Sequence, residues 1–99
     1  MVQHIEIRTT RRVEFVDITS RIRALVRESG VQSGLCVIHA PHTTAGLTLN
    51  ENADPDVSRD ILDKLHELAP QAGHYAHLEG NADAHIKASL LGCNLTLIV

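Results

Sequence analysis

The sequence PHTTAGLTLNENADPDVSRD occupies residues 41–60 and contains a turn, an apolar run and the beginning of a helix. Residues 41–44 are a polar turn, and the apolar run at residues 45–49 predicts a strand. Asp54 precedes Pro55, which predicts a helix start. Asp accepts a hydrogen bond from a free amide there, and Pro loses nothing at the first helical position. This stretch therefore predicts a strand that is followed by a capped helix.

Three segments of the chain carry helical patterns. After Pro55 an apolar face recurs at helical spacing until Pro70. A helix of about 11 residues is predicted before Gly30, which can stop it, and either Asp17 or Thr19 can cap its start. A third, short helix is predicted within residues 81–92. Residues 70–81 form a long polar loop, and loops of that length often carry function.

The remaining patterned segments predict strands. Residues 2–8 alternate between polar and apolar side chains, and residues 13–16 resume the pattern, so the two predict a hairpin. The apolar runs at residues 35–40 and 94–99 predict two further strands. Strands and helices are therefore both expected.

The bulk composition limits the kind of protein that this chain can be. Its 99 residues, with 43% hydrophobic and 21% charged side chains, are typical of one globular domain. The net charge is −3, no basic stripe is present and the only aromatic rings besides histidine are Phe15 and Tyr75, which disfavours nucleic-acid binding. No apolar segment is long enough for a membrane span. Cys36 and Cys93 are predicted to be buried thiols of a cytoplasmic protein.

Histidines and carboxylates concentrate in residues 74–85. The cluster consists of His74, His77, Glu79, Asp83 and His85. Imidazole and carboxylate are ordinary zinc ligands, and a loop that leads into a helix can bring several of them to one point. Their spacing matches no recognised zinc motif. Metal ligation and exposed surface histidine therefore both stay open at this point.

A second group of polar residues follows the strand predicted at residues 35–40. His42 lies on the turn with Thr43 and Thr44, whose hydroxyls could hold a phosphate or carboxylate, although a simple polar turn explains them equally well. Glu51 is a candidate general base or ligand. His39 lies inside the strand and is predicted to be packed.

Two blocks of this sequence resemble the two signature blocks of the YjbQ-like family. They are PHTTAGLTLNENADPDVSRD at residues 41–60 and HLEGNADAHIKASLLG at residues 77–92. The elements before and between the blocks also fit, so the resemblance covers residues 1–99 as a single domain. It implies an α+β fold, with a mixed β-sheet and packed helices, that usually forms a homotrimer.

The resemblance also implies site residues, position by position. The histidine of the first block is His42, the acid of its Asn-Glu pair is Glu51, and Lys87 follows the polar groups of the second block. The implied metal ligands are His42, His77 and His85. The implied catalytic residues are His42, Glu51 and Asp83, and the implied substrate-binding residues are Thr43, Thr44 and Lys87. The implied ion is divalent: zinc, or magnesium with a pyrophosphate substrate.

The family is associated with a secondary thiamine-phosphate synthase activity. In that reaction a pyrimidine pyrophosphate is joined to a thiazole phosphate and pyrophosphate leaves, so the substrates are small phosphorylated molecules. The departing pyrophosphate needs positive charge to stabilise it. The alternative interpretation is a noncatalytic oligomeric module that holds a metal or a phosphorylated ligand.

This sequence departs from the family pattern at its C-terminal end. Members continue past the equivalent of Val99 with a Gly-Thr-Trp-Gln segment and a strand that bears an Asp-Gly-Pro-Arg motif. This chain has no Trp at all. The comparison predicts a domain that is truncated at its C-terminus relative to the family.

Overall fold

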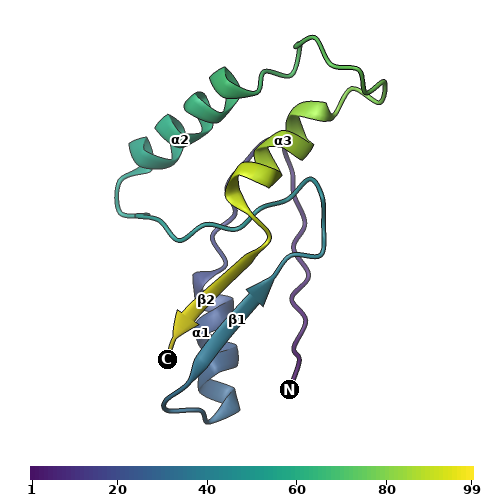
Figure 1. Cartoon of the computed structure of the whole chain (residues 1–99). Helices are drawn as coiled ribbons and strands as arrows, with labels where there is room; N and C mark the ends of the chain where they lie inside the picture. The colour runs from purple at the N-terminus through teal and green to yellow at the C-terminus, as the bar shows by residue number, and fades with distance from the viewer. The chain divides into compact units, whose positions relative to one another are not determined.

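The structure, a computed structural model, describes all of residues 1–99 and contains three α-helices and two β-strands (Figure 1). In chain order these are α1 (Thr19–Ser29), β1 (Leu35–His39), α2 (Pro55–Leu68), α3 (Ala82–Leu91) and β2 (Asn94–Ile98). The α+β class is confirmed. All three helices and the strands at the apolar runs 35–40 and 94–99 form where the sequence places them.

Both ends of α1 follow from local chemistry. Asp17 Oδ1 accepts hydrogen bonds from the backbone N–H and the hydroxyl of Thr19, at 2.9 and 2.6 Å. At the other end Gly30 has φ 74°, a left-handed conformation that glycine adopts without strain, and its N–H donates to the carbonyl of Arg27. The predicted stop at Gly30 is therefore confirmed, whereas the cap position itself is occupied by Ile18, and Asp17 bonds the first turn from the residue before it.

The beginning of α2 is also as predicted. Asp54 Oδ1 accepts a hydrogen bond from the N–H of Asp56 at 2.9 Å, and Pro55 occupies the first turn. The helix ends at Leu68, two residues before Pro70. One face of α2 is solvated and carries the ion pair between Lys64 and Glu67, whose side chains are 63% and 70% exposed.

The sheet consists of β1 and β2 in antiparallel register. Gly34 and Val99 exchange two backbone hydrogen bonds, and the N–H of Ala40 donates to the carbonyl of Cys93. This register places Cys36 opposite Leu97, and burial alternates along both strands. One side of the sheet is therefore half-buried, and the other is exposed.

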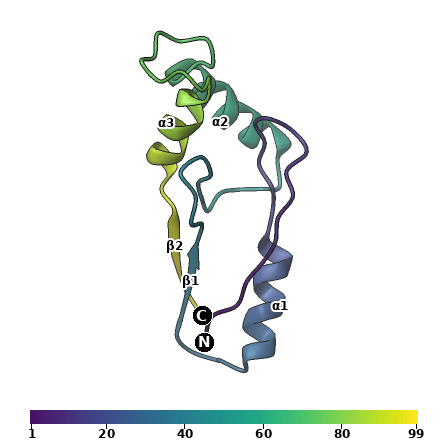
Figure 2. The same ribbon diagram turned by 90° about the vertical axis from the view of Figure 1, so that its right-hand side faces the viewer.

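Three predicted strands are absent from the structure. Residues 2–8, 13–16 and 45–49 contain no regular strand, and the sheet has only β1 and β2. An alternating pattern suits an extended backbone, but a strand exists only when a neighbouring strand bonds to it. The N-terminal segment is extended (Figure 2), and a hydrogen bond from Arg21 Nη1 to the carbonyl of Glu6 at 2.7 Å connects it to α1.

The chain divides into two compact units. The first contains Met1–Cys36 and Leu97–Val99, and the second contains Val37–Thr96. Full burial is confined to the second unit, where Ala69 and Ala88 are the buried apolar residues. None of the helices has the length and apolar composition that crossing a membrane would require.

Candidate functional site

The two sequence blocks meet at the end of α3. The N–H of Leu47 donates to the carbonyl of Gly92 at 3.0 Å. A Cβ atom on Gly46 would lie 2.8 Å from Leu91 Cβ, closer than real Cβ contacts. Only glycine therefore allows the first block to pack this closely against the helix of the second block.

A pair of histidines lies at the N-terminal end of α3. The ring centroids of His77 and His85 are 5.7 Å apart, and the rings meet edge to face at 88°. His77 belongs to the loop before the helix, whereas His85 belongs to the helix itself. Loop and helix therefore bring two imidazoles of this histidine-rich segment together in one place.

Asn81 and Glu79 hold the ring of His77. His77 Nε2 lies 3.0 Å from Asn81 Oδ1 and 3.8 Å from Glu79 Oε2. In the neutral tautomer that carries its proton on Nε2, this nitrogen donates to Asn81 Oδ1 and Nδ1 keeps its lone pair. The His77 side chain is 43% exposed, so a ligand can reach it.

Asn81 was not among the predicted site residues. An Asn at a helix start normally indicates capping, but the Asn81 side chain makes no cap hydrogen bond with α3. Its backbone carbonyl accepts from Ala84 instead. The only sequence signal is its position four residues after His77, which by itself does not distinguish a cap from a histidine partner.

Asp83 and Lys87 form a buried ion pair on α3. Lys87 Nζ donates to Asp83 Oδ2 at 3.1 Å, one helical turn apart, and the residues are 8% and 0% exposed. Charges this buried are tolerated when they neutralise each other. Lys87 was expected to bind substrate, but its ammonium group is directed at Asp83. Asp83 was expected to be catalytic, and the structure gives it Lys87 as a charge partner.

The predicted site residues of the first block lie on exposed loops. His42, Thr43 and Thr44 are exposed on the turn after β1, where the His42 N–H donates to the carbonyl of Ala40 at 2.8 Å. Glu51 is also exposed, before α2. Gly46 packs against α3, so the backbone of the first block contacts the second block. The side chains of His42, Thr43, Thr44 and Glu51, however, make no contact with the histidine pair.

The residues of this chain do not assemble a complete metal site. No group of three histidine, cysteine, aspartate or glutamate side chains is placed to hold an ion. The pair of His77 and His85 offers two imidazoles, and Asn81 already occupies Nε2 of the first. The ligand set of His42, His77 and His85 is therefore not assembled within one chain. It stays a prediction.

His39 differs from its predicted surroundings. It lies on the same side of β1 as Leu35 and Val37, as its position in the strand predicts, but that side is exposed rather than packed. Its Nδ1 is hydrogen-bonded to Asn94 Oδ1 on the neighbouring strand. The two predicted buried thiols, Cys36 and Cys93, are free and half-buried.

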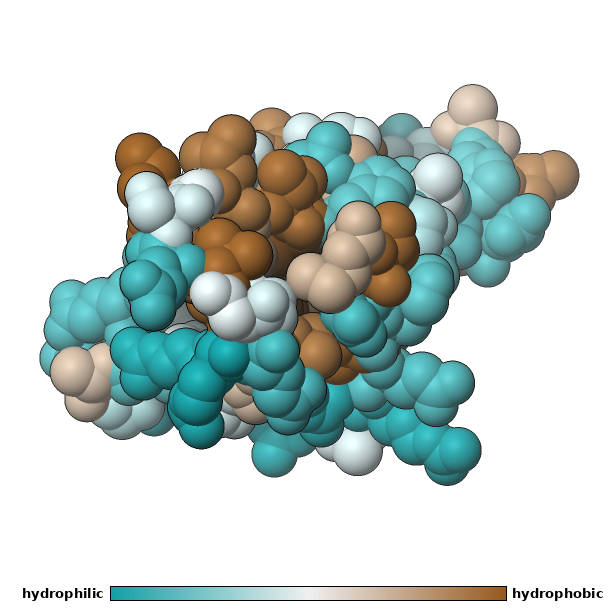
Figure 3. Space-filling view, turned by 90° about the horizontal axis from the view of Figure 1, so that it is seen from below, coloured by the Kyte–Doolittle hydropathy of each residue, from teal (hydrophilic) through white to brown (hydrophobic).

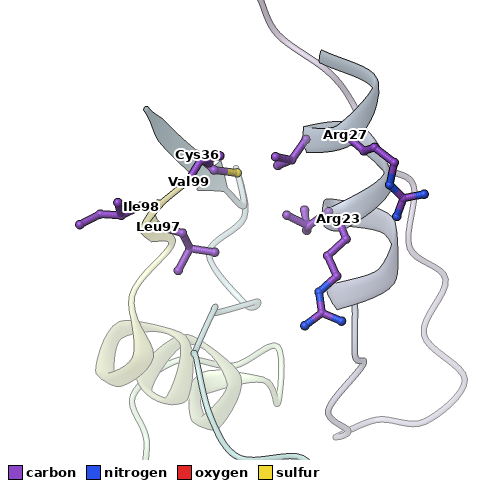
Figure 4. A pocket seen from close by; sticks show the side chains of 8 residues that line it. Arg23, Arg27, Cys36, Leu97, Ile98 and Val99 are labelled. Atoms are coloured by element: carbon purple, nitrogen blue, oxygen red, sulfur yellow. The ribbon is translucent and has the colours of Figure 1, made fainter. Parts of the chain in front are cut away.

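An apolar pocket of about 420 Å³ lies in the first unit, and none of the predicted site residues lines it. Its lining is formed by Ile22, Arg23, Val26, Arg27, Cys36, Leu97, Ile98 and Val99. Figure 4 shows the guanidinium groups of Arg23 and Arg27 directed away from the strand ends that carry Cys36 and Leu97. The pocket therefore offers mostly aliphatic surface, with the free thiol of Cys36 as its one nucleophilic group.

Sequence comparison places the chain among known proteins. Residues 3–99 match the family described as UPF0047 protein YjbQ-like. The chain belongs to this family. UPF0047 protein MJ1081 of Methanocaldococcus jannaschii is 53% identical over 94 residues, which are 95% of this chain and 68% of that protein. UPF0047 protein YugU of Bacillus subtilis is 45% identical over 100 residues, which are 100% of this chain and 76% of that protein.

Solved structures of YjbQ-like proteins have the same fold. A YjbQ/UPF0047 protein from Clostridium acetobutylicum superposes with a TM-score of 0.91 at 52% identity, over 94% of this chain and 72% of that one. A protein of unknown function from Sulfolobus solfataricus superposes with a TM-score of 0.89 at 34% identity, over 94% and 68%. The resemblance drawn from the two sequence blocks is confirmed for the family and for the fold.

Proposed function

We propose that this YjbQ-family chain belongs to a cytoplasmic group-transfer enzyme that acts on a small phosphorylated substrate at the histidine pair. The proposed reaction joins a pyrimidine pyrophosphate to a thiazole phosphate and releases pyrophosphate, as in secondary thiamine-phosphate synthase. The observation that carries the proposal is the edge-to-face contact between His77, on the loop before α3, and His85, on the helix that holds the buried Asp83–Lys87 pair.

Imidazole is the commonest general acid and base among protein side chains, which suits the histidine pair to proton transfer. With Nε2 of His77 bonded to Asn81, Nδ1 is the nitrogen that can accept a proton. A protonated ring would also place positive charge beside a leaving pyrophosphate. His85 lies close enough to share that charge, because its ring contacts that of His77.

The buried ion pair on α3 supports this arrangement. Asp83 and Lys87 neutralise each other below the surface, so neither leaves an unpaired charge next to the histidines. Substrate phosphates are then expected to meet His77, His85 and the exposed turn at Thr43 and Thr44. Lys87 would contribute to binding only through Asp83.

The resemblance also implies a homotrimer and a divalent ion. Zinc or magnesium would supply charge for the leaving group. Because a single chain does not assemble three ligands, every proposed step uses the side chains of this protein alone. The roles of His42 and Glu51 in catalysis are part of the proposal, to be tested beside those of the histidine pair.

A noncatalytic binding module is the second candidate. The direction of Lys87 favours it, since a site that stabilises a leaving pyrophosphate usually offers an open cation and this one is paired with Asp83. A binder of this kind would saturate with a phosphorylated ligand and release it unchanged.

One incubation distinguishes the two candidates. The protein is mixed with the pyrimidine pyrophosphate and the thiazole phosphate, and pyrophosphate release and product mass are measured. Replacing His77 or His85 with Ala should lower the rate roughly 100-fold or more. The His66→Ala variant is the control because His66 is exposed on α2. Unchanged ligand masses with saturable binding would favour the module.

A further inference from the structure

Asn81 is hydrogen-bonded to both members of the histidine pair. Its side-chain Oδ1 lies 3.0 Å from Nε2 of His77, and its backbone carbonyl accepts from the N–H of His85 at 3.4 Å. The same carbonyl accepts from the N–H of Ala84 at 3.1 Å. One residue therefore connects the ring of His77 to the backbone that carries His85.

The side chain of Asn81 does not cap α3. An Asn at this position normally accepts a hydrogen bond from an N–H of the first turn, as Asp54 does on α2. Asn81 has φ −122° and ψ 20°, outside the extended region that a cap residue normally adopts, and it makes no such bond. A residue suited to capping that bonds a histidine instead departs from the local rule, and such departures are expected at functional sites.

Glu79 is the other polar group near the ring of His77, and it orients the ring less firmly. Its Oε2 lies 3.8 Å from Nε2, beyond the range of a hydrogen bond, and its side chain is 73% exposed. An exposed charge at that distance is screened by water and contributes little. Asn81 Oδ1 is therefore the acceptor that fixes the orientation of the ring.

An oriented ring matters because apolar surface cannot select an atom of a ligand. Figure 3 shows apolar side chains gathered in a patch on one face of the molecule, in brown. Apolar contact is non-directional, so such a patch does not fix how a ligand lies. The ring of His77, which is 43% exposed, can do so through the nitrogen that Asn81 leaves open.

The orientation of His77 decides which atom the pair offers. A neutral imidazole donates from one nitrogen and accepts at the other. With the Nε2 proton directed at Asn81 Oδ1, the accepting atom is Nδ1, and the ring meets that of His85 at 88°. A ligand would then approach His77 with an atom that carries a proton, such as an N–H or O–H group.

We propose that Asn81 is the positioning residue of the histidine pair, because it holds Nε2 of His77 and so leaves Nδ1 to meet the ligand. Asn81 acts through the ring of His77, as the polar groups behind functional histidines generally do. The inference rests on the proposed function only where turnover is measured. The orientation and tautomer of His77 are properties of the protein alone.

NMR spectra of the histidine rings test the proposal directly. Proton–nitrogen spectra of labelled protein give the tautomer of each ring, and the His77→Ala and His85→Ala variants identify the signals of the pair. Spectra are recorded at about pH 9, well above the ordinary pKa of histidine. The parent should carry the His77 proton on Nε2. The ring protons of the pair should also be shifted by their edge-to-face contact.

Asn81→Leu removes the acceptor at a similar side-chain volume. This variant should increase the share of the Nδ1-protonated tautomer of His77 and move the ring-proton shifts of the pair toward their values in the unfolded chain. Asn81→Asp keeps an oxygen acceptor and should restore both. Asn94→Leu is the matched control, because Asn94 Oδ1 is bonded to His39, outside the pair. Glu79→Gln should also leave the spectra of the pair unchanged.

Kinetics with the pyrimidine pyrophosphate and the thiazole phosphate give the second readout. Asn81→Leu should lower kcat for pyrophosphate release roughly 10- to 100-fold and leave KM nearly unchanged, because Asn81 acts through His77. Asn81→Asp should recover most of kcat. Because Asn81 makes no cap bond, both variants should unfold at nearly the urea concentration of the parent. If Asn81→Leu loses the circular dichroism spectrum of the parent, Asn81→Ala replaces it.

Two spectroscopic results overturn the proposal. One is a set of ring shifts for His77 and His85 that is the same in the parent and in Asn81→Leu. The other is a parent ring of His77 protonated at Nδ1, since the amide of Asn81 would then donate rather than accept. A parent that releases no pyrophosphate contradicts the proposed function instead, and the spectra still decide the role of Asn81.

Discussion

Replacing Lys87 with Met should destabilise the protein far more than its single lost ion pair suggests. The carboxylate of Asp83 is 0% exposed and would lose the ammonium group that lies 3.1 Å away. Leaving a buried charge unpaired costs roughly 3–5 kcal/mol. A domain of this size has about 5–15 kcal/mol of stability in total, so the variant would lose a large share of it.

Lys64→Met is the matched control. Lys64 also pairs with a carboxylate on its own helix, at 2.9 Å, but both side chains of that pair are well exposed to water. An exposed pair of this kind contributes roughly 0.3–0.5 kcal/mol. The two substitutions are chemically identical, so the difference between them isolates the effect of burial.

Urea unfolding followed by far-UV circular dichroism measures both variants. Lys87→Met should lower the free energy of unfolding by at least about 2 kcal/mol more than Lys64→Met does. The double variant Asp83→Asn with Lys87→Met should recover about half of that loss or more, because no buried charge is then unpaired. Equal midpoints for the two single variants would refute the reasoning.

The caps, the packing and the proposed metal give three further predictions. Asp54→Ala removes the acceptor for the first turn of α2 and should cost about 1 kcal/mol in urea unfolding. Gly46→Ala should cost about 1–3 kcal/mol by the same assay, with Gly34→Ala as the milder control, because its Cβ would meet only a side-chain methyl at 3.3 Å. Elemental analysis of protein purified without an affinity tag should find a divalent ion that both His42→Ala and His85→Ala remove. Full metal content in either variant would contradict that residue's role as a ligand.

The helices of this protein could be predicted because their signals are local. Asp17, Gly30 and the Asp54–Pro55 pair act on backbone groups within a few residues of themselves, and the structure shows each of them in that role. No distant contact is needed for such a signal to work. The strands β1 and β2 could be predicted as well, since both are apolar runs with a partner strand in the chain.

Three other predicted strands are absent from the structure for a different reason. They are the ones at residues 2–8, 13–16 and 45–49. Alternation describes which face of a strand is apolar, but it cannot supply a neighbouring strand to bond with. The sheet in this structure has two strands, and these three segments lie outside it. Pairing between distant segments is decided by the tertiary structure.

The candidate site divides in the same way. The sequence by itself determined the chemistry available to it, because the histidines concentrate between residues 74 and 85 whatever the fold. Only the tertiary structure decided which groups meet: His77 with His85 and Asn81, and Lys87 with Asp83. The physical reason is that a side chain's partner depends on its direction and burial. Those depend on how the loop and α3 pack, and neither is encoded in spacing alone.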